Sequence, residues 1–120
     1  MSTISELEKA AQLYFDVLYE CNLEKFDALF HPSCHLFTVR DGVETVLPLP
    51  RYREIIAARQ SPASVGQPRE ERLDNILTLS AEAALIAVSV RVHDKRFKDH
   101  LGLIRGADGW RIVSKVYVAA

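Results

Sequence analysis

KDHLGLIRGADGWRIVSKVY, residues 98–117, is the stretch that decides the fold class, because it has the pattern of two strands joined by a tight turn. The turn is expected at GADG, residues 106–109, where two glycines and an aspartate interrupt the apolar positions. In the second strand, both alternating sets of positions contain apolar side chains. Because a sheet with one face in water alternates more cleanly, we expect both faces of this sheet to be covered.

The patterns outside this hairpin place helices in the first half of the chain and further strands around it. Helices are expected over residues 5–19, 23–30 and 51–59, where apolar positions recur at three and four. Strands are expected over residues 34–39, 43–47, 70–79, 84–92, 97–104 and 110–118. Ser5 is the expected N-cap of the first helix, and Asp41-Gly42 indicates the turn of the first hairpin. Helices followed by antiparallel strands are typical of the α+β class.

Composition narrows the class of protein. The chain has 120 residues, of which 48% are hydrophobic, and this predicts one core and a single domain over residues 1–120. Its 15 basic and 16 acidic residues create no overall field that would attract nucleic acid or an anionic membrane. No apolar run approaches the roughly 20 residues of a membrane span, and the N-terminus lacks a signal-peptide pattern. We therefore expect a soluble cytoplasmic protein that binds neither nucleic acid nor membrane.

A cluster of potential metal ligands, HPSCH at residues 31–35, has a simpler interpretation. A metal site would require His31, Cys34 and His35 to converge. Pro32 separates His31 from the other two, and Cys34 and His35 should point to opposite faces of a strand. We therefore predict no metal site at this position, and no other motif indicates a cofactor.

The order of motifs resembles the nuclear transport factor 2-like superfamily. The resemblance rests on LEKFDALFHPSCHLF at 23–37, YREII at 52–56 and DGWRIVSKVY at 108–117. The loop SPASVGQP at 61–68 and the hairpin at 98–117 most resemble its putative lumazine-binding group. The resemblance implies a cystatin-like α+β cone, with three N-terminal helices packed in the concave face of a strongly curved, mostly antiparallel sheet. It also implies an apolar cavity at the open end of the cone.

A more distant resemblance to steroid isomerases and polyketide cyclases nominates site residues. Tyr14 stands where the isomerases carry a tyrosine that donates to the developing oxyanion, although a core aromatic at this position is the alternative. Thr38 stands where they carry the aspartate general base, and threonine cannot accept a proton at neutral pH. Their protonated aspartate corresponds to His100 or to Asp99, depending on the alignment, and these neighbours should point to opposite faces of a strand.

On the last strand, the same comparison implies that Val113, Lys115 and Tyr117 face the cavity. Three roles stay open for Lys115. It could bind an anionic ligand, act as an amine of lowered pKa, or extend to solvent at the mouth of the cone.

Two classes of function are therefore expected. In the first, a homodimer formed through the outer face of the sheet binds an apolar or aromatic heterocyclic metabolite in each cavity. In the second, a cofactor-independent isomerase, dehydratase or cyclase uses Tyr14 with His100 or Asp99. The binding function is favoured because the expected general base is absent at Thr38. The expected ligand-binding residues are Tyr14, Thr38, Asp99, His100, Lys115 and Tyr117, and no catalytic residue is assigned.

Overall fold

The computed structural model describes residues 2–119, and within them the expected helices and strands are present in the expected order. The helices are α1 (Thr3–Glu20), α2 (Leu23–Leu29), α3 (Leu49–Ala58) and a short 3-10 helix, η1 (Ala63–Val65). The strands are β1 (Phe30–Arg40), β2 (Val43–Pro48), β3 (Glu71–Ser80), β4 (Ala83–Val92), β5 (Lys95–Gly106) and β6 (Gly109–Ala119). The structure therefore confirms the α+β class.

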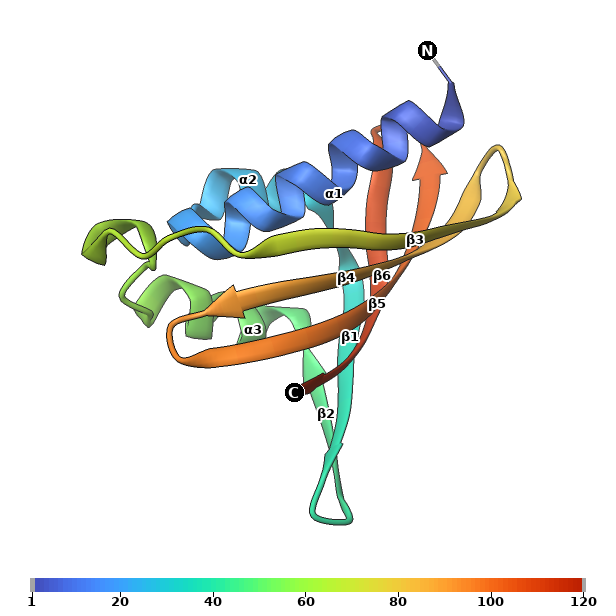
Figure 1. The fold of residues 1–120 in the computed structure, drawn as a ribbon. Coiled ribbons are helices and arrows are strands. Elements are labelled where there is room, and N and C mark those ends of the chain that lie inside the picture. Colours follow the sequence, from blue (N-terminus) through green and yellow to red (C-terminus); the bar gives the residue numbers. More distant parts are fainter. Residues whose placement is uncertain (1, 120) are drawn as a thin grey trace.

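The six strands form one strongly bent sheet in the order β2-β1-β6-β5-β4-β3. Neighbouring strands are antiparallel except β1 and β6, which run parallel. In Figure 1, β3, β4 and β5 cross the view while β1, β2 and β6 run down it, and the helices lie in the bend. Helix α1 contacts β3, β4 and β6, and α3 contacts β1 and β2. The curved sheet with helices on its concave face matches the expectation, although the sheet does not close.

The largest differences between the predicted and observed boundaries are at the N-cap of α1 and at the start of β1. The N-cap of α1 is Ser2 rather than Ser5, because the Ser2 hydroxyl accepts the backbone N–H of Ser5 at 3.1 Å. Strand β1 begins at Phe30 instead of Cys34, and the chain passes from α2 into extended backbone without a loop. Pro32 is tolerated there because it lies in the irregular part of the β1–β6 ladder, where its missing N–H costs no ladder hydrogen bond.

A β-bulge in β6 changes which side chains face the helices. Gly102 pairs with Ser114, whereas Leu103 pairs with Ile112, which leaves Val113 as an extra residue in β6. A Cβ atom on Gly102 would lie 2.5 Å from the Ser114 Oγ and 3.9 Å from a Val113 methyl group. Only glycine fits there without a shift of Ser114. The neighbours of Gly102 in β5, Leu101 and Leu103, are buried on the inner face, so Gly102 itself faces outward. Val113 lies beside Gly102 and is therefore also on the outer face.

The bulge corrects one expectation and preserves two others. Val113 does not face the cavity, contrary to the prediction from regular alternation. Ile112 and Lys115, three positions apart, are nevertheless both buried, and Tyr117 also lies on the inner side. The inward positions of Lys115 and Tyr117 therefore match the resemblance, while that of Val113 does not.

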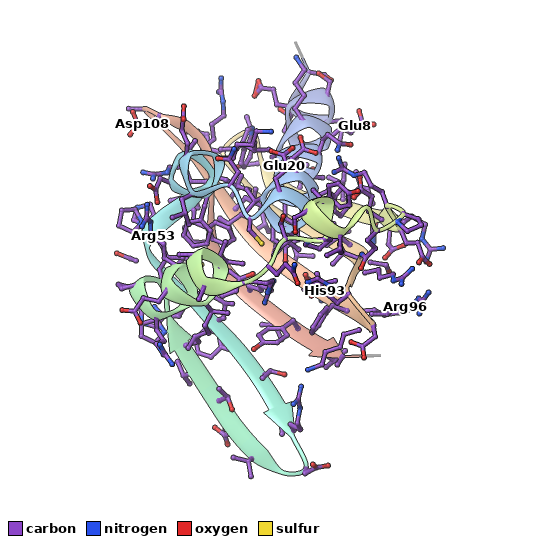
Figure 2. The ribbon with its side chains drawn as sticks, turned by 90° about the vertical axis from the view of Figure 1, so that its left-hand side faces the viewer. Glu8, Glu20, Arg53, His93, Arg96 and Asp108 are labelled. Carbon is purple, nitrogen blue, oxygen red and sulfur yellow. The ribbon has the colours of Figure 1, made fainter. Side chains whose placement is uncertain are left out.

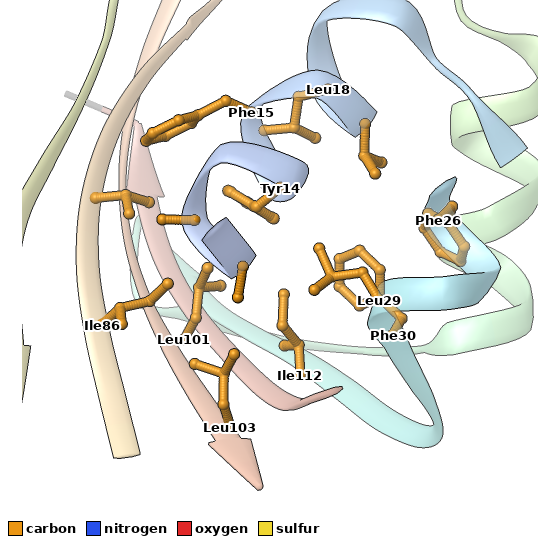
Figure 3. Close-up of a cluster of buried hydrophobic side chains, with 14 of the residues drawn as sticks. Tyr14, Phe15, Leu18, Phe26, Leu29, Phe30, Ile86, Leu101, Leu103 and Ile112 are labelled. Carbon is orange, nitrogen blue, oxygen red and sulfur yellow. The ribbon is translucent and has the colours of Figure 1, made fainter. Parts of the chain in front are cut away.

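The apolar core lies between α1, α2 and the middle of the sheet. Figure 3 shows Tyr14, Phe15 and Leu18 from α1 facing residues of α2, the start of β1, and β4 to β6. The labelled partners are Phe26, Leu29, Phe30, Ile86, Leu101, Leu103 and Ile112. Each large apolar side chain buried here contributes roughly 1.5–3 kcal/mol. The core fills this end of the bend and holds β5 and β6 in place.

The outer surface contains both charged and apolar regions. Charged side chains such as Glu8, Arg53 and Asp108 point away from the body of the molecule in Figure 2. The β1–β2 hairpin projects beyond the helices in Figure 1, and its turn is formed by Asp41 and Gly42, both with positive φ. Exposed apolar side chains on β1, β2 and β6 are Phe37, Val39, Val43, Val46, Val116 and Val118. None of the described helices is long and apolar enough to cross a membrane.

Candidate functional site

A cavity of about 180 Å³ opens beside α3, where that helix faces β1, β5 and β6. Its lining residues are Leu18, Leu36, Arg40, Leu47, Tyr52, Ile55, Arg59, Val90, Val92, Phe97, Asp99, Lys115 and Tyr117. Asp99, Lys115 and Tyr52 are no more than 6% exposed and form its deep end. Arg40 is exposed and Arg59 is half-buried, so these two lie at the mouth. The cavity is therefore apolar along its walls and charged at both ends.

Larger hollows occur on the surface, and in one of them several charged groups are paired with one another. One of about 340 Å³ lies over β3, β4 and β5. There the Glu70 carboxylate accepts hydrogen bonds from Arg91 at 2.5 Å and from Arg96 at 2.9 Å. These three charged groups thus neutralise one another at the surface. The smaller cavity is the better candidate because two of its charged groups, Asp99 and Lys115, are buried, and Asp99 keeps one acceptor without a partner.

At the deep end, Tyr14 of α1 and Asp99 of β5 form a buried hydrogen bond. The Tyr14 hydroxyl donates to the Asp99 Oδ2 at 2.5 Å, and neither side chain is more than 1% exposed. Burial raises the pKa of Tyr14 well above its usual value, and the charge of Asp99 adds to the rise. The phenol therefore stays protonated and continues to donate. Tyr14 itself lies behind Asp99 and does not line the cavity.

Lys115 of β6 places a buried ammonium group beside Asp99. Its Nζ donates to the Tyr52 hydroxyl at 3.1 Å and lies 3.8 Å from the Asp99 Oδ2. The same nitrogen lies 4.8 Å from the ring centroid of Tyr52, 5.1 Å from that of Tyr117 and 5.4 Å from that of Tyr14. Aromatic faces at these distances attract a cation.

The protonation state of Lys115 follows from these neighbours. Burial alone lowers the pKa of Lys115, but Tyr52 and Asp99 outweigh it, and the net pKa is raised above its usual value. Lys115 is thus a buried cation. This excludes two of its three expected roles, the amine of lowered pKa and the side chain extended into solvent.

Asp99 retains one acceptor that no described residue fills. Its Oδ1 is buried and has no hydrogen-bond partner, whereas its Oδ2 accepts from Tyr14. A buried polar atom without a partner costs roughly 1–3 kcal/mol. Because Asp99 lines the cavity, a donor group on a ligand that reached Oδ1 would remove this cost.

The structure separates the six expected ligand-binding residues into three groups. Asp99, Lys115 and Tyr117 line the cavity, and Tyr14 supports Asp99 from behind. His100 lies on the exposed outer face, so the expectation that it could face the cavity is corrected and the alternative, Asp99, points inward.

Thr38 does not line the cavity either. Its hydroxyl donates to the backbone carbonyl of Tyr117 at 2.6 Å, across the β1–β6 pair. Thr38 therefore contributes to strand pairing at this end of the sheet, and its expected contact with the ligand is not supported.

Three polar residues of the cavity, Tyr52, Arg40 and Arg59, were missed by sequence reasoning. Tyr52 lies at helical spacing with Ile55 and Ile56, so it looks like an ordinary core position of α3. Arg40 and Arg59 look like residues that follow a strand or end a helix. Nothing in their local patterns brings them together, because the cavity is assembled from α3 and distant strands.

The residues of HPSCH do not converge. The His31 Nδ1 accepts the backbone N–H of Ser33, His35 is exposed, and Cys34 is fully buried. Burial raises the pKa of Cys34 to about 11, so its thiol is unreactive at neutral pH. Within residues 2–119, no group of three or more His, Cys, Asp or Glu side chains is placed to hold a metal ion.

The fold and the position of the cavity define an α+β cone of the nuclear transport factor 2-like class. A protein of this class from Shewanella baltica, of unknown function, has 18% identity and a TM-score of 0.85 over 98% of this chain and 93% of its own. Another from Silicibacter pomeroyi, also of unknown function, has 17% identity and a TM-score of 0.83 over 98% and 95%. A ketosteroid isomerase-like protein from Erwinia carotovora atroseptica has 13% identity and a TM-score of 0.71 over 96% and 94%.

Sequence comparison assigns the family. The model of the family described as putative lumazine-binding matches residues 2–118, and the chain belongs to this family. No curated protein sequence matches the chain. The resemblance stated from the motifs is therefore confirmed for the superfamily and for the family within it.

Proposed function

We propose that the protein binds a small aromatic or heterocyclic metabolite in this cavity, with one edge of the ring against Lys115 and Asp99. The observation that carries the proposal is a buried, incompletely satisfied charged pair at the end of an apolar cavity. A buried ion pair is a poor stabiliser of a fold, because desolvation offsets most of its attraction. The position of the Asp99–Lys115 pair at the end of a cavity supports a role in ligand binding instead.

The two charged groups favour a particular ring chemistry. The Lys115 ammonium has three N–H donors, of which one is directed to Tyr52, while the Asp99 Oδ1 is an unfilled acceptor. A ring that carries a carbonyl oxygen next to an N–H group would complement both. Lumazine, pterin and pyrimidinedione rings have such an edge, and the family description supports this class.

The walls and volume of the cavity agree with a compact ring. Aromatic side chains of Tyr52, Phe97 and Tyr117 line the cavity and can pack against a planar ligand. The volume of about 180 Å³ is below the roughly 300 Å³ at which most ligand pockets begin. One small ring system fits inside, and any longer substituent must leave through the mouth.

The binding proposal is tested by titration with lumazine and by mass spectrometry of metabolites that stay bound through gel filtration. Asp99→Asn and Lys115→Met should each weaken lumazine binding by at least about tenfold, because each removes a charge-assisted hydrogen bond. His100→Ala is the matched control, since it changes the next residue of β5 on the exposed face. Absence of any bound ring compound, or equal affinity in Asp99→Asn and the wild type, would contradict the proposal.

A cofactor-independent isomerase, dehydratase or cyclase is the second candidate, and the Tyr14–Asp99 hydrogen bond supports it. In this function the Lys115 ammonium would stabilise negative charge that develops on a bound carbonyl oxygen, and the Asp99 carboxylate, held by Tyr14, would accept a proton from the substrate. Because His100 is exposed on the outer face, this proposal uses the Tyr14–Asp99 pair of the two expected pairs. Conversion of the bound ligand over time, slowed in Tyr14→Phe, would support the enzyme, and unchanged ligand would support binding alone.

We also propose that a second copy of the chain covers the outer face of β1, β2 and β6. Phe37, Val46 and Val116 are 41–55% exposed there and line a hollow of about 290 Å³. Contiguous apolar surface of this kind marks an interface. Sedimentation at micromolar concentration should show a dimer in the wild type and a monomer in Val116→Glu. A wild-type protein that sediments only as a monomer rules this interface out.

A cytoplasmic location belongs to the same proposal. Cys21 and Cys34 are both free thiols, which suits a reducing compartment. Cell fractionation with an antibody to the protein tests this, and recovery from a secreted fraction would contradict it.

A further inference from the structure

Two arginines at the mouth of the cavity differ from all the other described arginines. Arg40 lies at the end of β1, and Arg59 lies at the C-terminal end of α3. Their side chains have no hydrogen bond or ion pair with another described residue. The side chain of every other arginine in residues 2–119 forms an ion pair with a carboxylate or donates to a backbone carbonyl. Both unpartnered guanidinium groups line the same cavity.

The charge around the cavity is unbalanced although the whole chain is nearly neutral. The formal net charge of the chain is -1. Arg40, Arg59 and Lys115 line the cavity, whereas Asp99 is the single carboxylate among its lining residues within 2–119. Asp99 lies beside Lys115 at the deep end and leaves the two arginines at the mouth without a counter-charge. The excess of positive charge is therefore concentrated where a ligand would enter.

Each guanidinium group is suited to bind a planar anion. Guanidinium groups donate pairs of parallel hydrogen bonds to a carboxylate, and these bonds are about twice as strong as neutral ones. Arg59 is close enough to the buried cluster to oppose the rise in the pKa of Tyr14, so its charge reaches the cavity interior. Arg40 is exposed and Arg59 is half-buried, so both can meet an anionic group at the mouth.

We propose that the ligand is a ring acid, with its carboxylate held by Arg40 and Arg59 at the mouth while its ring occupies the cavity. This inference rests on the proposed function, because it names the class of the same ligand. It also accounts for the small volume, since the charged substituent stays outside the part of the cavity that the ring fills.

The test compares pterin with pterin-6-carboxylate, two fluorescent rings that share the carbonyl and N–H edge and differ in one carboxylate. Fluorescence titration of the full chain should give at least about tenfold tighter binding of the carboxylate, because its charge-assisted hydrogen bonds are absent with pterin. Arg40→Gln and Arg59→Gln should each reduce the preference, and the double variant should abolish it. Higher salt should weaken only the carboxylate complex.

Arg51→Gln is the matched control. It removes the same charge from α3, but Arg51 is exposed, pairs with Glu54 and does not line the cavity. Both affinities should stay at the wild-type values in this variant. Because Arg40 and Arg59 have no partners among the described residues, their glutamine variants should also unfold at the wild-type urea midpoint.

The outcomes separate the two levels of the proposal. Equal binding of both probes to the wild type, or a preference that survives in the double variant, would overturn the ring acid and leave ring binding intact. If neither probe binds the wild type, the ring-binding function fails and the ring acid fails with it.

Discussion

The two ends of the β5–β6 hairpin carry opposite chemistry on the same face of the sheet. Toward the turn, Leu103 and Ile112 are buried in a solid apolar core (Figure 3). Toward the chain terminus, Asp99 and Lys115 are equally buried but charged, and they border an open cavity. The bulge at Val113 lies between these ends. Because of the bulge, Ile112 and Lys115 both face the helices, and the same two strands contribute to the apolar core and to the cavity.

The two ends also differ in what they contribute to stability. Apolar burial at the core end is favourable for each side chain. At the cavity end, the charged pair loses hydration, and its attraction roughly repays that loss only while both partners are present. The core end therefore stabilises the fold, and the charged pair at the cavity end contributes little net stability.

The largest expected effect is loss of one partner of the buried pair. Lys115→Met leaves the Asp99 carboxylate buried without a cation and should lower the free energy of unfolding by about 3–5 kcal/mol, measured by urea denaturation. The double variant Asp99→Leu/Lys115→Met should recover most of this loss, because no charge is left buried. A single variant as stable as the wild type would show that the pair is not buried in solution.

A truncated side chain at the core end should lower the free energy of unfolding somewhat less and should leave the affinity for lumazine unchanged. Leu103→Ala creates a cavity in the apolar core and should lower the free energy of unfolding by about 3 kcal/mol. Lumazine affinity, measured at a temperature where the variant is folded, should stay unchanged because Leu103 does not line the cavity. A large loss of affinity in this variant would contradict the separation of the two ends.

Tyr14 lies at the junction of the two ends, and its hydroxyl is needed only by the cavity end. Tyr14→Phe keeps the ring in the core but removes the hydrogen bond to Asp99, and should cost about 2 kcal/mol of unfolding free energy. Asp99→Asn in the Tyr14→Phe background should add less than it does in the wild type, since the two residues interact directly. Strict additivity in this double-mutant cycle would argue against the hydrogen bond.

The smallest effect is an alkaline loss of stability that originates at the cavity end. The pKa values of Tyr14 and Lys115 are raised in the folded protein above the ordinary values of 10.0 and 10.5. The unfolded chain therefore releases protons that the folded chain retains, and stability falls as the pH rises past about 10. Urea midpoints between about pH 8 and pH 11 should show this fall, and it should be shallower in Tyr14→Phe. A midpoint that rises over this range would refute the assignment.

Much of the fold was predictable because it depends on local patterns. The helical spacing of Leu7, Tyr14 and Leu18, the turn at Asp41-Gly42 and the 106–109 turn all appear in the structure at their expected places. The family was also predictable, since its motifs close the fold at the end of α2 and at the start of β6. The predicted N-cap of α1 and the predicted start of β1 were wrong, because positions a few residues apart have similar local preferences.

The candidate site was less predictable because it depends on register. Regular alternation along β6 would place both Val113 and Lys115 on the inner face. Because β6 has an extra residue at the bulge, Lys115 faces the helices and Val113 does not. The choice between Asp99 and His100 likewise depended on strand pairing, which sequence alone left open. A shift of one residue would exchange a buried carboxylate for a buried imidazole.

The sequence by itself determined the class of the fold, the family and the presence of ionisable groups on the last two strands, because these follow from periodicity and motif order. The tertiary structure decided which of those groups are buried together. In it the Tyr14 hydroxyl donates to Asp99 and Lys115 donates to the hydroxyl of Tyr52, while the side chains of Arg40 and Arg59 at the mouth have no described partner. These contacts join residues far apart in the chain, and only the bend of the sheet and the bulge at Val113 bring them together.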